Sequence, residues 1–351
     1  MSLAEIPVAV IGCGHMGRHH VRKYREMAGA RLVAVIDADG ERAKKAADEA
    51  GVRWATSLTP ELGDIAAVSI AVPTVHHLKV AAPLIERGIA VLIEKPLAPT
   101  SADAEHIAHL SQKHNTIVQV GHTERFNPAI RAIERMGVAP KFVETHRISP
   151  FTFRSADVGV VFDMMIHDID VVLSLVRDQV THVDAVGVNV LGPHEDIANA
   201  RLRFAGGAVA TLTASRLALK TERKLRAFSE TSYISLDYQK KLGIAVTRDK
   251  NADVIKFARE RNIEDLSQIS AADYVKLVKV EPLMIQDKDA LADELETFLD
   301  CVRHRRRPPV SAEDGVAAVR VAEQIVDSIK QHRWDGAAGP RVGLDADIFR
   351  V

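Results

Sequence analysis

The stretch Val8-Ala9-Val10-Ile11-Gly12-Cys13-Gly14-His15-Met16-Gly17 joins an apolar run directly to a G-x-G-x-x-G turn. The apolar run predicts a strand buried on both faces, and a helical pattern follows the turn over residues 15–28. Glycines permit a tight turn with a bare backbone, and the first amides of a helix attract an anion. The stretch therefore predicts a dinucleotide-binding β-α unit, with Gly12, Gly14, His15, Met16 and Gly17 around the pyrophosphate. The alternative is a glycine turn needed only for packing.

Further apolar, β-branched runs alternate with helical patterns along the first third of the chain. Strands are expected at 32–36, 67–72, 90–93 and 116–120, and helices at 40–50, 75–87 and 101–113. Strands separated by helices indicate βαβ units with parallel strands. Residues 1–121 are therefore expected to form a Rossmann domain with a doubly wound parallel sheet, as part of an α/β protein.

Asp37 indicates which dinucleotide binds. It ends the second expected strand, 20 residues after Gly17. A carboxylate there can accept hydrogen bonds from the hydroxyls of an adenosine ribose, and it repels a 2′-phosphate. The sequence therefore predicts NAD rather than NADP as the cofactor. Asp39 is a second acid that could face the ribose instead.

The pattern changes after Gly121. One long helix is expected at 161–175, strands at 182–190, 197–204, 208–216, 224–228, 232–237 and 243–246, and two closing helices at 290–303 and 312–331. Successive strands joined by short polar turns predict an antiparallel sheet, covered on one face by the long helix. Residues 122–351 are therefore expected to form an α+β domain with an open, mostly antiparallel sheet. The polar segment 248–272 reads as a surface excursion.

Composition excludes several classes of function. The chain has 351 residues, with 46 Lys and Arg against 47 Asp and Glu, so it lacks the basic excess of a nucleic-acid-binding protein. No apolar run approaches the length of a bilayer span, and no signal-peptide pattern precedes Val8. We expect a cytoplasmic protein. Neither the two cysteines nor the histidines suggest a metal site, and His19, His20, His106 and His109 are expected on exposed or half-exposed helix faces.

Glu94-Lys95-Pro96 lies at the carboxyl end of the strand at 90–93. Open α/β sheets bind ligands at this edge, and partial burial there makes an ammonium group useful for proton transfer. The alternative is a surface lysine at an ordinary strand-to-loop junction.

The long helix carries a second candidate group. Asp163 and His167 are four residues apart, and Asp170 is one turn further, so an α-helix would stack them on one face. A carboxylate near an imidazole orients it for acid-base chemistry. The apolar neighbours indicate a buried helix, where polar groups are costly without a purpose. The alternative is an Asp/His pair on a solvated face.

Together these motifs resemble the glucose-fructose oxidoreductase/inositol dehydrogenase (Gfo/Idh/MocA) family over nearly the whole chain. The resemblance implies NAD(P)-dependent oxidation or reduction of a sugar or polyol carbon, and an open C-terminal sheet that supports oligomers, here a homodimer or homotetramer. It implies that Lys95 is the catalytic lysine and that Asp163 and His167 flank the substrate hydroxyl. It also assigns the nicotinamide side of the cofactor to Val72, Pro73, Thr74, His77, Glu94, Lys95 and Pro96.

Gly121-His122-Thr123-Glu124-Arg125-Phe126-Asn127-Pro128 and residues 157–163 resemble the nucleotide-sugar branch, in particular UDP-N-acetylglucosamine 3-dehydrogenases, which feed a 3-aminotransferase in lipid A or surface-glycan synthesis. This implies that His122, Arg125 and Asn127 meet the substrate. Arg147 and Arg154 are expected to hold its diphosphate, because arginine forks suit phosphate. Each could equally be a surface guanidinium.

The expected reaction is hydride transfer from a secondary alcohol to NAD⁺. Lys95 or His167 accepts the hydroxyl proton, and Asp163 orients or charges the other group. One alternative is a dehydrogenase of a free sugar or polyol, of the inositol type. Another is a non-catalytic NAD-sensing protein, although the joint presence of Lys95, Asp163 and His167 argues against it.

Overall fold

The structure is a computed structural model that describes residues 4–59, 64–152, 158–191, 193–248, 259–261 and 278–333. Contacts divide the chain into two compact units, one of Met1–Asn127 with Lys288–Gln324 and one of Pro128–Asp287 with Ile325–Val351. The division expected from sequence, after residue 121, differs mainly in residues 288–324. These residues return to the first unit.

The first unit contains a parallel sheet in the order β3-β2-β1-β4-β5-β6. Its strands are β1 (Ile6–Ile11), β2 (Ala30–Ile36), β3 (Arg53–Ala55), β4 (Ala67–Ile70), β5 (Ala90–Glu94) and β6 (Val118–Gly121). β4 and β5 are buried at every position, as parallel strands with both faces covered should be. The chain order reverses between β1 and β4, which is where such sheets bind ligands.

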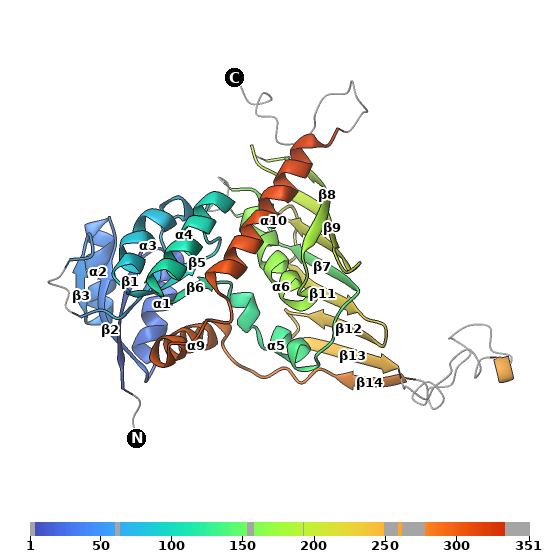
Figure 1. Cartoon of the computed structure of the whole chain (residues 1–351), viewed down its shortest axis with the longest axis horizontal. Helices are drawn as coiled ribbons and strands as arrows, with labels where there is room; N and C mark the ends of the chain where they lie inside the picture. Colours follow the sequence, from blue (N-terminus) through green and yellow to red (C-terminus); the bar gives the residue numbers. More distant parts are fainter. Residues whose placement is uncertain are drawn as a thin grey trace. The chain divides into compact units, whose positions relative to one another are not determined.

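Helices cover both faces of this sheet. They are α1 (His15–Glu26), α2 (Gly40–Ala50), α3 (His77–Glu86), α4 (Ser101–His114) and α9 (Ala290–His304). Figure 1 shows α3 beside α4, and α9 beside α1. Leu295, Phe298 and Leu299 of α9 complete the same apolar core as Val8, Val10 and Leu92. This packing explains why α9 belongs to the first unit.

The second unit contains a sheet in the order β14-β13-β12-β11-β7-β10-β9-β8. Its strands are β7 (Phe142–Ile148), β8 (Val180–Val188), β9 (Ile197–Phe204), β10 (Val209–Ser215), β11 (Glu222–Phe228), β12 (Ser232–Asp237), β13 (Leu242–Arg248) and β14 (Val278–Pro282). All neighbours are antiparallel except β7 and β10. The predicted fold class, a parallel Rossmann sheet followed by an open, mostly antiparallel one, is confirmed.

One face of the second sheet is covered. β9 alternates strictly between exposed and buried residues, and the π-helical turn η5 (Val161–Met165) and α6 (Ile166–Val176) pack against β7 and β10. Helix α10 (Ala312–Gln331) starts in the first unit and ends in the second, where Ser328 donates to the carbonyl of Ala185. The core of this unit therefore lies between the sheet and its helices.

Several short elements and one central strand of the described residues were not predicted. β3, β14 and α5 (Pro128–Arg135) are short, whereas β7 pairs with both β10 and β11 in the middle of the sheet. The inward positions of β7 are Val143, Thr145 and Arg147. Because two of these buried residues are polar, the sequence of β7 lacks the alternation of apolar and polar residues that would predict a strand. Most of the segment 248–272 lies outside the described residues.

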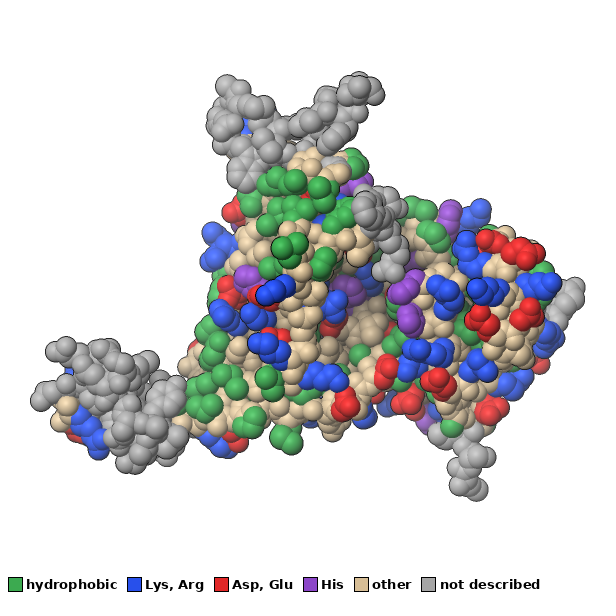
Figure 2. All heavy atoms as spheres, turned by 180° about the vertical axis from the view of Figure 1, so that it is seen from behind, with side chains coloured by type: hydrophobic (Ala, Val, Ile, Leu, Met, Phe, Trp, Pro, Cys, Tyr) green, Lys and Arg blue, Asp and Glu red, His purple; other side chains and the backbone are tan. Residues whose placement is uncertain are grey.

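On the face seen in Figure 2, acidic and basic side chains are interspersed, without a broad area of one sign. No helix in the described part of the chain is long and apolar enough to cross a bilayer.

Candidate active site

The glycine turn after β1 has space for a phosphate group. Gly12 has φ +95°, and a Cβ there would lie 2.5 Å from the carbonyl oxygen of Ala71. A Cβ at Gly17 would overlap the carbonyl of Gly12, whereas nothing lies within 4 Å of the Cβ position of Gly14. Gly14 also caps α1 without a side-chain acceptor for its first amides. Open space before free helix amides fits the pyrophosphate of NAD.

Asp37 is fixed beside this turn. Its side chain is 7% exposed, and it accepts hydrogen bonds from the backbone N–H of Cys13 at 2.8 Å and of Asp39 at 2.9 Å. The Asp39 side chain instead caps α2 by accepting from the N–H of Arg42 at 3.1 Å. Because the Asp39 side chain caps α2, Asp37 is the acid that we propose as the ribose ligand. The thiol of Cys13 is buried and its pKa is raised to about 11, chiefly by burial, so it is unreactive at neutral pH.

His77 ties together two strand ends at the carboxyl edge of the sheet. Its Nε2 lies 3.0 Å from the carbonyl of Val72, after β4, and its Nδ1 lies 3.0 Å from that of Pro96, after β5. Burial lowers the pKa of the imidazole more than these carbonyls raise it. The His77 ring thus lies between two strand exits, with Val72, Pro73, Thr74 and Pro96 at one corner of the sheet.

Glu94 lies beneath Lys95 and is only 6% exposed. Its Oε1 is 2.8 Å from Nε2 of His20, and its Oε2 accepts weakly from the N–H of Lys95 at 3.3 Å. Burial raises the pKa of Glu94, but the His20 hydrogen bond and the nearby positive charges outweigh it, so the net shift is downward. Lys95 is half-buried at the end of β5. The carboxylate beside it is therefore ionised.

The prediction that His20 lies on an exposed or half-exposed face of its helix is wrong, because its side chain is 0% exposed. A signal for its burial was present in the sequence. Gly17, His20, Val21 and Tyr24 recur at helical spacing and form the buried face of α1. The absence of metal-ligating neighbours in the sequence does not indicate whether a histidine has a buried carboxylate partner, and His20 has one in Glu94.

His122 follows β6 and is fully buried. Neither ring nitrogen has a hydrogen-bond partner among the described residues. Burial, with the charges of Arg125 and Lys95, lowers the pKa of this imidazole to about 3. Nearby, Arg125 donates to the carbonyl of Pro309 at 3.2 Å and Asn127 to Glu124 at 3.1 Å. His122 is thus a neutral, fully buried imidazole close to the charges of Lys95 and Arg125.

Asp163 and His167 lie in the second unit and are both half-buried. Asp163 belongs to the π-helical turn η5 and His167 to α6. The expectation that they stack on one face assumed 3.6 residues per turn along the whole helix. The wider π turn changes that spacing between them.

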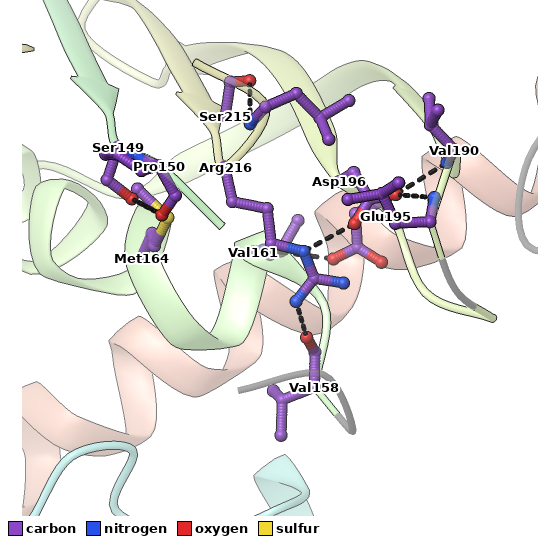
Figure 3. A network of polar contacts seen from close by, with 12 residues as sticks. Ser149, Pro150, Val158, Val161, Met164, Val190, Glu195, Asp196, Ser215 and Arg216 are labelled. Carbon is purple, nitrogen blue, oxygen red and sulfur yellow. Dashed lines mark hydrogen bonds and ion pairs between the residues drawn. The ribbon is translucent and has the colours of Figure 1, made fainter. Parts of the chain in front are cut away.

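The start of this helix is held by residues far along the chain, as Figure 3 shows. The backbone carbonyl of Glu195 accepts from the N–H of Val160, and its Oε1 accepts from the N–H of Val161 at 3.1 Å. Arg216 donates to the carbonyl of Val158 at 2.7 Å and to Asp196 at 2.6 Å. Two helix amides and the preceding carbonyl are thus fixed from outside the helix.

Gly159 lies against the same carboxylate, and a Cβ there would overlap it. Burial raises the pKa of Glu195 above its ordinary value, despite the hydrogen bond from Val161. Neither Glu195 nor Arg216 was predicted, because no local pattern marks a carboxylate that caps a helix 34 residues away.

Arg147 has a partner that the sequence did not reveal. Its Nε and Nη2 donate to Asp168 at 2.8 and 2.9 Å, and the two side chains are 5% and 4% exposed. This fork joins β7 to α6 inside the second unit. The guanidinium thus has a buried carboxylate as its partner, which favours a structural role for Arg147. Arg154, the other expected diphosphate ligand, lies outside the described residues.

The first unit therefore gathers one set of predicted residues at the carboxyl edge of its sheet: the glycine turn, Asp37, Val72, Pro73, Thr74, His77, Glu94, Lys95, Pro96 and His122. The second unit holds Asp163 and His167. Among the described residues, no group of three or more His, Cys, Asp or Glu side chains could hold a metal ion.

Two family models match the chain. Residues 6–122 match the oxidoreductase family with an NAD-binding Rossmann fold, and residues 139–234 match the GFO/IDH/MocA C-terminal domain. UDP-N-acetylglucosamine 3-dehydrogenase from Acidithiobacillus ferrooxidans is 33% identical over 332 residues, which cover 91% of this chain and 95% of that protein.

The solved structure of that dehydrogenase superposes with a TM-score of 0.82, at 30% identity, and covers 93% of this chain and 99% of its own. Inositol 2-dehydrogenase 3 from Saccharopolyspora erythraea is 25% identical over 338 residues, covering 92% and 93%. The identity with the first relative extends through both units. The chain thus belongs to the GFO/IDH/MocA family and is an NAD-dependent oxidoreductase that acts on CH–OH groups.

Proposed function

We propose that this chain oxidises the C3 hydroxyl of UDP-N-acetylglucosamine to the 3-keto sugar with NAD⁺. The observation that carries the proposal is the 33% identity with a UDP-N-acetylglucosamine 3-dehydrogenase over 91% of this chain. The substrate-binding domain is included in that similarity, and it decides which sugar is bound. The same assignment suggests a 3-aminotransferase as the next enzyme, in lipid A or surface-glycan synthesis, and a cytoplasmic homodimer or homotetramer.

The first unit supplies the cofactor site in this proposal. Gly12, Gly14, His15, Met16 and Gly17 surround the pyrophosphate, and Asp37 accepts from the adenosine ribose. Val72, Pro73, Thr74, His77, Glu94, Lys95 and Pro96 line the nicotinamide side. When NAD⁺ is bound, its nicotinamide ring accepts the hydride. The chain itself must orient the sugar carbon and remove the hydroxyl proton.

Lys95, Asp163 and His167 perform that acid-base work. Lys95 or His167 accepts the proton from the sugar hydroxyl, and Asp163 orients or charges the other group. The hydrogen bonds from Val160 and Val161 to Glu195 support this role, because they fix the start of the helix that carries Asp163 and His167. A well-placed acid-base group contributes about 10²- to 10⁴-fold in rate, so losing one should nearly abolish turnover.

His122, Arg125 and Asn127 contact the substrate in this proposal, and Arg154 contacts its diphosphate. This proposal leaves Arg147 out of that set, because its guanidinium is buried and already paired with Asp168.

A second candidate is a dehydrogenase of a free sugar or polyol. It is favoured by the inositol 2-dehydrogenase that aligns with 92% of this chain at 25% identity. The two candidates share the fold, the cofactor and the catalytic groups. They differ only in whether a nucleoside diphosphate is bound.

A substrate panel distinguishes them. The purified protein is mixed with NAD⁺ and UDP-N-acetylglucosamine, N-acetylglucosamine, glucose or myo-inositol, and NADH is followed by absorbance, with an aminotransferase added to remove the ketone. We expect turnover of the UDP-sugar and very little of the free sugar. Lys95→Ala should abolish it while NAD⁺ binding, measured by calorimetry, changes little. Preferred turnover of myo-inositol or glucose selects the second candidate.

A further inference from the structure

Glu94 is surrounded by titratable groups from four parts of the first unit. His20 reaches it from α1, His77 lies on α3, His122 follows β6, and Lys95 directly follows Glu94 at the end of β5. The backbone of Gly121 closes the remaining side, where a Cβ would lie 3.1 Å from the carboxylate. The carboxylate is thus enclosed, with Lys95 as its half-buried neighbour.

The charges of these groups differ. Burial lowers the pKa values of both His77 and His122, the second to about 3, so the His122 ring is neutral at physiological pH. Glu94 is ionised. A carboxylate in such a site stabilises the protonated form of an amine close to it. Lys95 therefore lies beside one negative charge, the Glu94 carboxylate, and near the neutral imidazole of His122.

His20 connects this charge to the cofactor-binding helix. Gly14 caps α1 at the glycine turn, and His20 lies less than two turns further along the same helix. Its ring donates to Glu94 Oε1 across a fully buried contact of 2.8 Å. Without that donor, the buried carboxylate would lose the hydrogen bond that fixes its orientation.

We propose that His20 and Glu94 form a positioning pair for Lys95: His20 holds the Glu94 carboxylate in place, and Glu94 stabilises the ammonium form of the lysine. Both are positioning residues, since neither is assigned to the reacting atoms. The relevance of the pair to catalysis rests on the proposed function, in which Lys95 is a catalytic residue. The effect of Glu94 on the charge of Lys95 is independent of that function.

The charge effect can be measured without any substrate. The protein is labelled with trace acetic anhydride between pH 6 and 11, and mass spectrometry gives the labelling midpoint of each lysine. In Glu94→Gln, the Lys95 midpoint should fall by about one pH unit or more, because an adjacent opposite charge is worth roughly 1 to 3 units. Exposed Lys79 on α3 is the internal control and should not move.

A second variant separates charge from packing. His20→Phe disturbs the same contact but leaves the carboxylate, which stays ionised where lysine titrates, so the Lys95 midpoint should fall clearly less than in Glu94→Gln. A downward shift of similar size in both variants would overturn the electrostatic role, because the shift would then not depend on the carboxylate charge. An unchanged Lys95 midpoint in Glu94→Gln would overturn the electrostatic role.

The positioning role of His20 is tested by rescue. His20→Gln keeps an N–H donor and should retain kcat with UDP-N-acetylglucosamine within about threefold, whereas His20→Phe should lose about tenfold or more. In a Glu94→Gln background, His20→Phe should cause little further loss, because both act through one contact. Normal kcat in His20→Phe would remove His20 from the pair. If the wild type does not turn over this sugar, the proposed function fails while the labelling result still stands or falls alone.

Discussion

Arg147→Ala should destabilise the protein rather than weaken substrate binding. The guanidinium is bound at two points to Asp168, and both side chains are 5% exposed or less. Removing it leaves a carboxylate buried without its partner, at a cost of about 3 to 5 kcal/mol. For a unit of this size, each kcal/mol lowers Tm by roughly 2 to 4 °C. The expected decrease is therefore about 6 to 20 °C.

Calorimetry of matched variants measures this decrease. Arg226 on β11 is paired with Glu144 at 3.3 Å in the same sheet, but its side chain is 51% exposed. Arg226→Ala removes an exposed pair and should cost less than about 1 kcal/mol. The double variant Arg147→Ala, Asp168→Ala should recover part of the lost stability, because the isolated buried charge is gone.

The contrary result is specific. An Arg147→Ala protein with unchanged Tm and a KM for UDP-N-acetylglucosamine raised by about 10- to 150-fold, as expected for one charge-assisted hydrogen bond, would return the arginine to the diphosphate. The geometric argument for a structural fork would then be wrong.

Three further perturbations have expected outcomes. Asp37→Ser should raise kcat/KM with NADP⁺ relative to NAD⁺ by roughly 10- to 150-fold, since Arg42, now 3.6 Å from Asp37, becomes available to the 2′-phosphate; an unchanged ratio would contradict the ribose assignment. Glu195→Ala should lower kcat by about 10- to 100-fold, because it releases the start of the helix that carries Asp163 and His167. Glu195→Gln keeps an acceptor oxygen for the N–H of Val161 and should not lower kcat. Equal losses in the two variants would argue against this role of the Glu195 hydrogen bond. An unfolded histidine takes up a proton near pH 6.5, but folded His122 does so only near pH 3, so acidification between these values favours the unfolded chain. In His122→Phe, the free energy of unfolding measured with urea should therefore depend less steeply on pH between 6.5 and 4.5, by about 1.4 kcal/mol per pH unit. An unaltered slope would refute this explanation.

The strongly patterned elements could be predicted from sequence. β1, the glycine turn and α1 follow from local rules, and β9, β12 and α10 have the expected bounds. β7 could not be predicted, because the buried side of this central strand carries Thr145 and Arg147. α6 supplies Asp168 as a buried partner for Arg147, and that pairing between distant segments is not visible in either segment alone.

In the candidate active site, too, some residues could be predicted from local sequence and others could not. Residues that follow strand ends, such as Asp37 and Lys95, were placed by the rule that parallel sheets bind ligands at that edge. Residues defined by a distant partner were missed, namely His20 against Glu94 and Glu195 against Val161. The π turn at Val161–Met165 was also missed, since an apolar helix pattern does not distinguish one wide turn from a regular one.

The fate of the hydrogen on C3 tests the central claim most directly. The enzyme is incubated with NAD⁺ and UDP-N-acetylglucosamine deuterated at C3, and the reduced cofactor is analysed by mass spectrometry, with C4-deuterated sugar as the control. The proposed reaction predicts one deuterium in the reduced nicotinamide from the C3-labelled sugar and none from the C4-labelled one. Transfer from C4, or reduced cofactor without deuterium from the C3-labelled sugar, would contradict oxidation at C3.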